Sequence, residues 1–585
     1  MGNRLNPAQR QQHLNALANE DFDVVVIGGG VTGAGVALDA ASRGLKTAVI
    51  EAQDWAAGAS GRTSRLVVGG LRYLYLCDFG FVAESIRERG LLVSSIAPHL
   101  VKPQPFLWPM RESRAERAKA TAAIGVFDLL TRTVGRGTLP PHRQLSREAA
   151  LKLAPDLRLE GVNGAIEFHD ARVDDARLVI TLVRTAAEYG ACAVSRAEVV
   201  RMTRAEDAPV TGVIVRDLET GNELQVRTRG VIIATGVWTQ HTQALAQADS
   251  GLRVLASKGI HLVVPKERIN AQTGIFLRTR ESAIGIIPML DHWIIGSTDS
   301  AWHQSLLHPV PTRAEVDKLL HQINPVLARP LAHGEICGCY AGLRPLLQHR
   351  FDNDSRTTRI SREHGVAQVA PGIVCVAGGK LTTYRLMAVQ AVDFLLRRAE
   401  AAKHPSVTDR TPLLGAQGIQ AMTNQSERIG TIYGWDARTM QHLLERYGGE
   451  LPELLEMVDA DLTLAAPLQA APEYLRVEVA RACVAEGVLH LEDILAQRLR
   501  LNLDYLDRGA GAVDEVVAIA GPLLGWSAQR CTQEKQNYLA RVSAERAAEQ
   551  AATDESAVTR RRQAADIVTL GLGGDLMSQP RLLTG

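Results

Sequence analysis

The sequence predicts an α/β protein with a separate helical domain toward its C-terminal end. A strand, a glycine-rich turn, a helix and a second strand follow one another between Asp23 and Glu51, and short apolar strands recur as far as Ala377. Beyond about Arg410, alanine and leucine dominate and apolar residues follow helical spacing. The chain has 585 residues, too many for one compact core, so we expect two or three domains.

The first predicted element is the β-branched strand Asp23–Ile27, which runs into a G-x-G-x-x-G turn. Gly28 allows the tight turn, Gly30 lets a pyrophosphate approach the backbone, and Gly33 lets the following helix pack close to the strand. That helix is expected from about Thr32 to Arg43. Its N-terminal amides and its dipole favour a bound anion.

A second strand, Lys46–Ile50, ends at Glu51, which lies at the sequence distance expected for an acid that binds ribose hydroxyls. The strand before the turn, the helix after it and this acid together predict a Rossmann-type dinucleotide-binding domain. The alternative is a tight strand–helix turn that binds no ligand.

The remaining elements are predicted from periodicity and from the positions of glycine and proline. Asp174 is expected to cap a helix that Gly190 ends. Residues 1 to about 20 are predicted as a polar arm, and Arg560–Arg562 as a solvated basic tail, with a membrane-surface patch as the alternative. The other expected elements are a loop at Gly58–Leu74, helices at Asp78–Ile96 and Asp175–Tyr189, and strands at Gly230–Ala234, Ile260–Val264, Trp293–Ile295 and Ile373–Ala377.

The composition narrows the class of protein. The net charge of +1 argues against a nucleic-acid-binding protein. The N-terminal stretch has no apolar signal core and no apolar run is long enough to span a bilayer, so we expect a cytoplasmic protein and leave peripheral contact with the inner face of the membrane open. The seven cysteines are scattered and odd in number, which favours reduced thiols, and no metal site is predicted.

Three distant segments each combine glycines or a turn with a cation. They are Gly58–Leu66 continued by Gly69–Leu74, Tyr340–Pro345, and Gly378–Arg385. Glycine lets a flat ring approach backbone amides, and a neighbouring cation then reaches past the ring to an anionic substrate. We therefore expect the segments to meet at the dinucleotide; the alternative is that each cation is a solvated loop charge.

These segments make the chain resemble the FAD-dependent glycerol-3-phosphate dehydrogenases of the aerobic bacterial type, and more widely the glycine-oxidase-like flavoenzymes. The C-terminal LEDILAQRLRLNLDYLDRG is similar to the helical cap domain of that family. The matching stretches from about residue 22 to 390 are IGGGVTGAGVALDAASRGL, GGLRYL, APHLVKPQPFLWP, VDDARLV, ATGVW, SKGIHLVVP, IIGSTD, YAGLRP and GGKLTTYR.

The resemblance implies FAD as cofactor and glycerol metabolism as the setting: sn-glycerol 3-phosphate is oxidised to dihydroxyacetone phosphate by hydride transfer. Electrons then pass to a membrane quinone or another acceptor such as oxygen, and a homodimer is left open. It also implies a Rossmann-type FAD-binding domain interleaved with an α+β substrate domain. The expected boundaries are 1–20 for the arm, 21–75, 166–255 and 341–405 for the FAD-binding domain, 76–165 and 256–340 for the substrate domain, 406–570 for the helical domain and 571–585 for a tail.

The resemblance also implies roles for individual residues. Because a phosphate dianion suits guanidinium groups, Arg344 and Arg72 are the expected substrate anchors. Lys380 is expected near the flavin pyrimidine edge, and Tyr73 and Thr298 as further hydrogen-bonding residues. The expected cofactor-binding residues are Ile27, Gly28, Gly29, Gly30, Val31, Thr32, Gly33, Glu51, Ala52, Ser60, Ser64, Arg65, Leu66, Gly69, Gly70, Ala234, Thr235, Gly236, Gly342, Arg344, Gly379, Lys380, Leu381 and Thr382.

The chain departs from the family pattern S-S-x-x-S-S-K-L-x-H-G-G at its lysine and at its histidine. Val68 replaces the histidine, so neither a histidine base nor a histidyl–flavin bond is available there, and FAD is expected to be non-covalent. Arg65 replaces the lysine. His261 is interpreted as a structural histidine, with a substitute base as the alternative, and Asp299 is interpreted as a turn residue. Two alternatives stay open: a related flavin oxidase of an amine or 2-hydroxy acid, and a catalytically weakened flavin-binding homologue.

Overall fold

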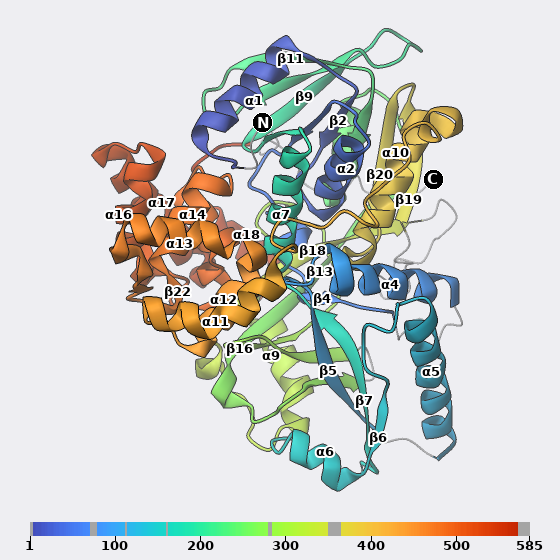
Figure 1. The fold of residues 1–585 in the computed structure, drawn as a ribbon, viewed down its shortest axis with the longest axis vertical. Coiled ribbons are helices and arrows are strands. Elements are labelled where there is room, and N and C mark those ends of the chain that lie inside the picture. Colours follow the sequence, from blue (N-terminus) through green and yellow to red (C-terminus); the bar gives the residue numbers. More distant parts are fainter. Residues whose placement is uncertain are drawn as a thin grey trace.

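The described part of the protein contains two large mixed β-sheets, a smaller four-stranded sheet and a C-terminal helical domain that includes a short hairpin (Figure 1). The computed structural model describes residues 4–70, 79–110, 114–158, 162–278, 283–348 and 364–570. The predicted Arg72 and Tyr73 lie outside these described residues. No helix within the described ranges is long and apolar enough to cross a lipid bilayer.

The first sheet has six strands and carries the glycine-rich turn. Its strands run parallel apart from β19, which pairs antiparallel with β20, and their β-branched residues are buried on both faces, as is usual in parallel sheets. Helices α2 (Val31–Ser42), α7 (Asp175–Glu188) and α10 (Tyr384–Ala401) pack together on one face. The strand order is β19 (His364–Ala370), β20 (Ile373–Gly378), β12 (Val231–Ile233), β2 (Val24–Ile27), β3 (Thr47–Ile50) and β8 (Cys192–Val194).

The opposite face of this sheet is covered by α1 (Pro7–Asn19) and a four-stranded sheet, ordered β1 (Asp21–Phe22), β11 (Glu223–Thr228), β10 (Gly212–Asp217) and β9 (Ala197–Thr203). The expected polar arm is therefore mostly a helix. Asn6 caps it by accepting from the Gln9 amide at 2.8 Å, and Leu14 and Leu17 are buried. The sequence pattern did not indicate this helix, because its apolar residues are few and only a narrow stripe of them packs against the rest of the protein.

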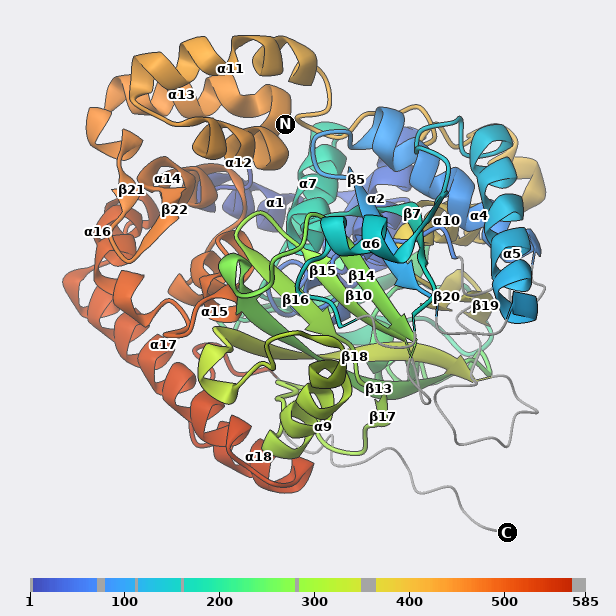
Figure 2. The same ribbon diagram turned by 90° about the horizontal axis from the view of Figure 1, so that it is seen from below.

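The second sheet is larger and lies beside the first (Figures 1 and 2). Its longest pairing joins β13 (Arg253–Pro265) antiparallel to β18 (Gly338–Gln348), with Gly259 opposite Gly342 and His261 opposite Tyr340. The main path of this sheet has the strand order β17 (Ser300–Ala301), β13, β16 (His292–Gly296), β15 (Ala283–Pro288), β14 (Gly274–Arg278), β5 (Lys102–Pro109), β7 (Ala165–Arg172) and β4 (Leu66–Val67). Strand β6 (Arg143–Leu145) pairs with β7. Flanking helices include α4 (Phe79–Leu91), α5 (Arg114–Thr133), α6 (Arg147–Leu153) and α9 (Arg313–Ile323).

The helical domain lies along one side of both sheets, with α18 beside α9 (Figure 2). The prediction of a solvated basic tail is wrong for Arg561, because this side chain is 2% exposed and pairs with Glu545 and Asp566. The domain's main elements are α11 (Ile419–Tyr433), α12 (Ala437–Tyr447), α13 (Leu451–Ala460), the hairpin β21–β22 (Pro467–Leu468 and Ala471–Leu475), α14 (Arg476–Ala485), a π-helix (Asp493–Arg498), α15 (Leu501–Asp504), α16 (Val513–Leu524), α17 (Ala528–Glu549) and α18 (Asp554–Arg561). The domain boundaries given above stay predictions.

Candidate active site

A cavity of about 840 Å³ runs from the carboxyl ends of β2, β3 and β12 to the β13–β18 pair of the larger sheet. Clefts at the carboxyl ends of parallel strands are the usual ligand sites of open α/β sheets. The volume is at the upper end of the range for cofactor and ligand pockets. This is the candidate site, and its two ends differ in chemistry.

The glycine-rich turn forms the first end. Gly28 has φ of +112°, and a Cβ there would lie 2.6 Å from the Ala234 carbonyl oxygen. A Cβ on Gly33 would lie 1.8 Å from the Gly28 carbonyl oxygen, so only glycine lets α2 begin this close to β2. Gly30 immediately precedes α2 and lines the cavity, and the positive end of the helix therefore faces the space where a diphosphate would lie.

Glu51 closes the same end, where β3 ends. Its carboxylate accepts hydrogen bonds from the Gly29 amide at 2.5 Å and the Gln53 amide at 2.7 Å. Burial raises the pKa of Glu51, while these amides and the more distant Arg196 lower it. The carboxylate is thereby fixed at the cavity wall, with oxygen lone pairs left to accept from a ribose.

Residues 52–66, here called the 52–66 loop, form one long wall of the cavity. The Ser60 hydroxyl accepts from the Val31 amide at 2.9 Å, so this wall is tied to the first turn of α2. The Ser64 hydroxyl lies 2.8 Å from His261 Nε2 in β13. The loop therefore bridges both ends of the cavity.

Arg344 on β18 provides the cation at the second end. Its Nη2 donates to Ser297 Oγ at 2.5 Å and to the Thr298 carbonyl at 2.9 Å, and Nη1 lies 3.7 Å from the Asp299 carboxylate. A Cβ on Gly259 would lie 2.1 Å from Nη2. The glycine thus leaves the space that the guanidinium occupies on the sheet.

His261 lies beside Arg344 and also lines the cavity. Its ring stacks on Tyr340, with centroids 4.9 Å apart, and a Cβ on Gly296 would lie 2.5 Å from it. Burial, then the charges of Arg344 and Arg65, lower the pKa of His261 to about 3. The imidazole is therefore neutral near pH 7, and it is a weaker base than an ordinary histidine.

Lys380 and Thr382 close the remaining side. Lys380 Nζ lies 3.6 Å from the centroid of the Phe81 ring, a cation–π contact. Thr382 Oγ1 accepts from the Val68 amide at 3.0 Å, which joins the segment after β20 to the strand after the 52–66 loop. Val68 itself lines the cavity.

Comparison with known proteins identifies the family. The model of the FAD dependent oxidoreductase family matches residues 23–386, and that of the C-terminal domain of alpha-glycerophosphate oxidase matches residues 406–531. The chain belongs to the FAD-dependent oxidoreductase family. The predicted family resemblance, the α/β fold class and FAD as cofactor are confirmed for this oxidoreductase.

The similarity to known proteins covers nearly the whole length of the chain. Glycerol-3-phosphate dehydrogenase 2 of Mycobacterium tuberculosis is 47% identical over 92% of this chain and 91% of its own, and a glycerol-3-phosphate dehydrogenase of Mycobacterium leprae is 45% identical over the same shares. A solved structure of the glycerol-3-phosphate dehydrogenase from Bacillus halodurans complexed with FAD has a TM-score of 0.74 at 24% identity, covering 92% of this chain and 98% of that one. That structural likeness shows the shared fold.

Most residues predicted for the oxidoreductase site lie at one cavity, although they come from distant parts of the chain. The roles given to them stay predictions. The predicted residues that line the cavity are Ile27, Gly28, Gly30, Val31, Thr32, Glu51, Ala52, Ser60, Ser64, Leu66, Gly70, Ala234, Thr235, Gly236, Thr298, Gly342, Arg344, Gly379, Lys380, Leu381 and Thr382.

Four predicted residues do not line the cavity. Gly29 and Gly33 lie behind its wall, and Gly69 donates its amide to Asp170 at 2.9 Å. Arg65, expected at the cofactor, points away instead: it is 2% exposed and pairs with Asp504 of the helical domain. Both terminal nitrogens of its guanidinium donate to Asp504, a residue far away in the chain, so no local sequence pattern indicates this pairing.

Sequence reasoning also missed residues of the oxidoreductase site. His261, which the sequence offered as a substitute base only as an alternative, and Asp299, interpreted as a turn residue, both line the cavity, and their roles stay predictions. Ser297 holds Arg344 and was not singled out. The glycines that make room for these side chains could have indicated their positions. Gly259 leaves space for the Arg344 guanidinium, and Gly296 leaves space for the His261 ring. Trp108, Phe168 and Trp238, also unforeseen, add aromatic lining.

Proposed function

We propose that this oxidoreductase uses non-covalently bound FAD to oxidise sn-glycerol 3-phosphate to dihydroxyacetone phosphate. The observation that carries the proposal is Arg344, a guanidinium held at the far end of the cavity into which the glycine turn opens. A guanidinium suits a phosphate dianion. The two mycobacterial relatives, named glycerol-3-phosphate dehydrogenases, support the same substrate.

The residues at the first end fit FAD. The α2 N-terminus, with Gly28 and Gly30, would hold the diphosphate, and Glu51 would accept from the ribose hydroxyls. Ser60 and Thr382 would fix the walls on either side of the cofactor. Val68 has no nucleophile for a covalent bond to the ring, which supports non-covalent binding.

When bound, FAD would supply the two-electron redox chemistry of the oxidation. Arg344 would bind the phosphate and orient C2, and Lys380 would stabilise negative charge on the reduced ring. Arg72 and Tyr73, which lie outside the described residues, are proposed as a further anchor and a hydrogen-bonding residue. Thr298 presents its hydroxyl to the Ile260 amide at 3.0 Å, so its proposed role is to hold β13 beside Arg344.

His261 lines the same cavity as Val68, and its Nε2 lies 2.8 Å from the Ser64 hydroxyl. We propose that these two groups orient the C2 hydroxyl by hydrogen bonds. Burial and the charge of Arg344 lower the pKa of His261 to about 3, so the ring is a weak base and its proposed role is positioning.

The finer features of the reaction are also proposals. We propose a membrane quinone as the electron acceptor, a cytoplasmic location at the inner face of the membrane, and peripheral attachment. A homodimer is the proposed assembly. Turnover with a soluble quinone analogue, against oxygen alone, tests the acceptor; equal rates with oxygen would reject the quinone.

An anaerobic titration of the purified protein with sn-glycerol 3-phosphate tests the main proposal. Full bleaching of the visible flavin band is expected. A flavin that stays oxidised at millimolar substrate would reject the proposal. A parallel panel of amines and 2-hydroxy acids distinguishes the oxidase alternative, and no bleaching with any compound would indicate a flavin-binding homologue without turnover.

A further inference from the structure

Three contacts connect the helical domain to the 52–66 loop. All three come from one short segment, residues 498–504, which runs from the last residue of the π-helix Asp493–Arg498 through α15. This segment is here called the arm; it is distinct from the polar arm predicted at residues 1–20. Arg498 binds Asp54 through two hydrogen bonds of 2.6 and 2.9 Å. Asp504 binds Arg65 through two more, at 2.7 and 3.1 Å. The loop is thus gripped near each end by a bidentate ion pair.

The third contact lies between these two. Arg500 Nη2 donates to the Gly61 carbonyl at 2.6 Å and to Asp175 Oδ1 at 3.0 Å. The other oxygen of Asp175 accepts from the amide and the hydroxyl of Thr63, both at 2.8 Å. A Cβ on Gly61 would lie 2.5 Å from the Ala56 carbonyl oxygen of the loop itself and 3.4 Å from Arg500 Nη1. The glycine therefore lets the loop fold tightly on itself and leaves room for the arm.

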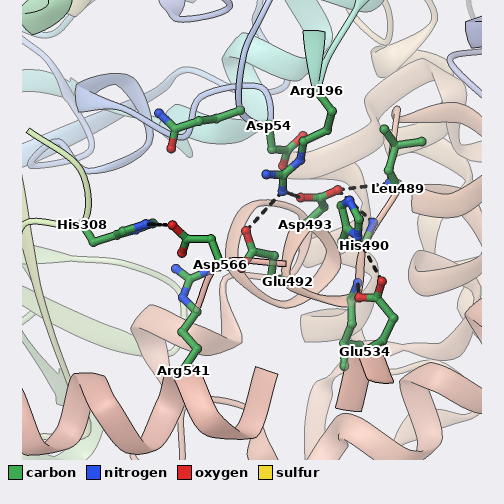
Figure 3. Close-up of polar contacts among 12 residues, drawn as sticks. Asp54, Arg196, His308, Leu489, His490, Glu492, Asp493, Glu534, Arg541 and Asp566 are labelled. Atoms are coloured by element: carbon green, nitrogen blue, oxygen red, sulfur yellow. Dashed lines mark hydrogen bonds and ion pairs between the residues drawn. The ribbon is translucent and has the colours of Figure 1, made fainter. Parts of the chain in front are cut away.

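The neighbouring charges extend the same junction (Figure 3). Arg196, whose backbone amide donates to Gln53, binds Asp493 at 2.6 Å and Glu492 at 3.1 Å. In Figure 3 it projects from the sheet side toward these two acids of the helical domain, beside Asp54. Buried pairs of this kind are costly to break singly, because each would leave an unpaired charge.

The backbone is unusual at this junction. Ala56, Arg65, Arg196 and Arg500 all have φ between +53° and +64°. Such conformations are strained for a non-glycine residue and persist where surrounding contacts enforce them. The arm also begins at a π-helix, a form that recurs at functional positions. Strained residues therefore lie where the two domains meet beside the cavity.

We propose that the arm is a clamp for the cofactor: Arg498, Arg500 and Asp504 are positioning residues that hold the 52–66 loop in its FAD-binding shape. This rests on the proposed FAD site, because the loop lines that cavity from Ala52 to Leu66. By linkage, a contact that strengthens FAD binding is itself strengthened by FAD to the same extent. Binding of FAD and docking of the helical domain onto the 52–66 loop are therefore thermodynamically coupled, so that each strengthens the other.

The test compares two equally buried arginines. Arg500→Gln removes the middle contact, whereas the matched control Arg481→Gln breaks the pairs with Glu450 and Glu453 away from the cavity. The dissociation constant of FAD is measured on apoprotein by flavin fluorescence, with melting temperature alongside. We expect FAD binding to weaken by about tenfold or more in the first variant, the effect of one lost contact, and by less than about twofold in the control.

Equal FAD affinity of Arg500→Gln and wild type, or equal weakening in both variants, would overturn the clamp. Should Arg500→Gln not fold, hydrogen exchange on the wild type decides: FAD must raise protection of amides 498–504, and unchanged protection rejects the proposal. Titrating the same wild-type sample with sn-glycerol 3-phosphate separates the two ideas. Flavin that binds with this coupling but is not reduced rejects the proposed substrate and leaves the clamp intact.

Discussion

At the scale of single residues, small side chains determine where the charged groups of the site lie. Gly259 and Gly296 remove the Cβ atoms that would overlap Arg344 and His261. The functional groups lie flat on the sheet as a result, and the cavity stays open above them. Substitutions at these four positions therefore separate substrate effects from folding effects.

Arg344→Ala is expected to weaken substrate binding or transition-state stabilisation by about 2–4 kcal/mol, because it removes a charge-assisted contact to a dianion. FAD content should stay nearly unchanged. Steady-state kinetics together with the flavin-to-protein ratio check this. Loss of FAD in the variant would instead make Arg344 a cofactor or structural residue.

Gly259→Ala is expected to act on the same guanidinium without removing it. The added Cβ meets the far end of a flexible side chain, so Arg344 should move while the fold persists. We expect KM for the substrate to rise by about tenfold, the effect of a displaced anchor, with a small change in melting temperature. A large fall in melting temperature at unchanged KM would contradict this account.

Glu51→Ala is expected to weaken FAD binding and to leave the substrate preference unchanged, because the acid lies at the opposite end of the cavity from Arg344. Loss of one charged hydrogen bond costs about 1.5–3 kcal/mol. Equilibrium dialysis of FAD measures the effect. Undiminished flavin occupancy would rule out the proposed ribose contact.

At the scale of elements, α7 shows how a local signal and a distant contact combine. Asp174 caps the helix by accepting from the Arg177 amide at 3.1 Å and also pairs with Arg446 at 2.9 Å. We expect Asp174→Ala to cost more than the loss of a cap alone, which is about 1 kcal/mol. Ser146→Ala, which removes only the cap of α6, is the control in urea unfolding. Equal costs would show that the Arg446 pair contributes nothing.

Whether the sequence could predict a feature depends on how far apart along the chain its interacting residues lie. The β2–α2–β3 unit and the cap of α7 depend on residues a few positions apart, so periodicity and glycine spacing are enough. The helix α1 was missed because its apolar stripe is narrow. The pairing of Arg65 with Asp504, and the approach of His261 to Ser64, join residues far apart in the chain, and nothing local specifies them.

At the scale of the whole molecule, buried charges join the helical domain to the rest. His490 lies between Glu219 and Glu534 at 2.8 and 3.0 Å. Burial alone would lower its pKa, but these hydrogen bonds raise the pKa of His490 to about 9. The other charges facing it are Arg530, Asp493 and Arg196.

This raised pKa gives a signed pH dependence. The folded state binds the proton more tightly than the unfolded state, so the contribution to stability is complete below about pH 6.5 and is lost as pH rises through about 9. We expect the urea midpoint of the wild type to fall from pH 7 to pH 9.5, and to fall less in His490→Gln. An equal fall of the urea midpoint in both proteins would show that His490 does not cause the pH dependence of stability.

The strand order of the first sheet has a consequence for biosynthesis. β12 pairs with β2 on one side and with β20 on the other, so this sheet must wait until residue 378 has left the ribosome. The arm that grips the 52–66 loop follows more than one hundred residues later. With the proposed clamp, a nascent chain displays the glycine turn long before the arm exists, and we expect loading of the flavin to be one of the last events of folding.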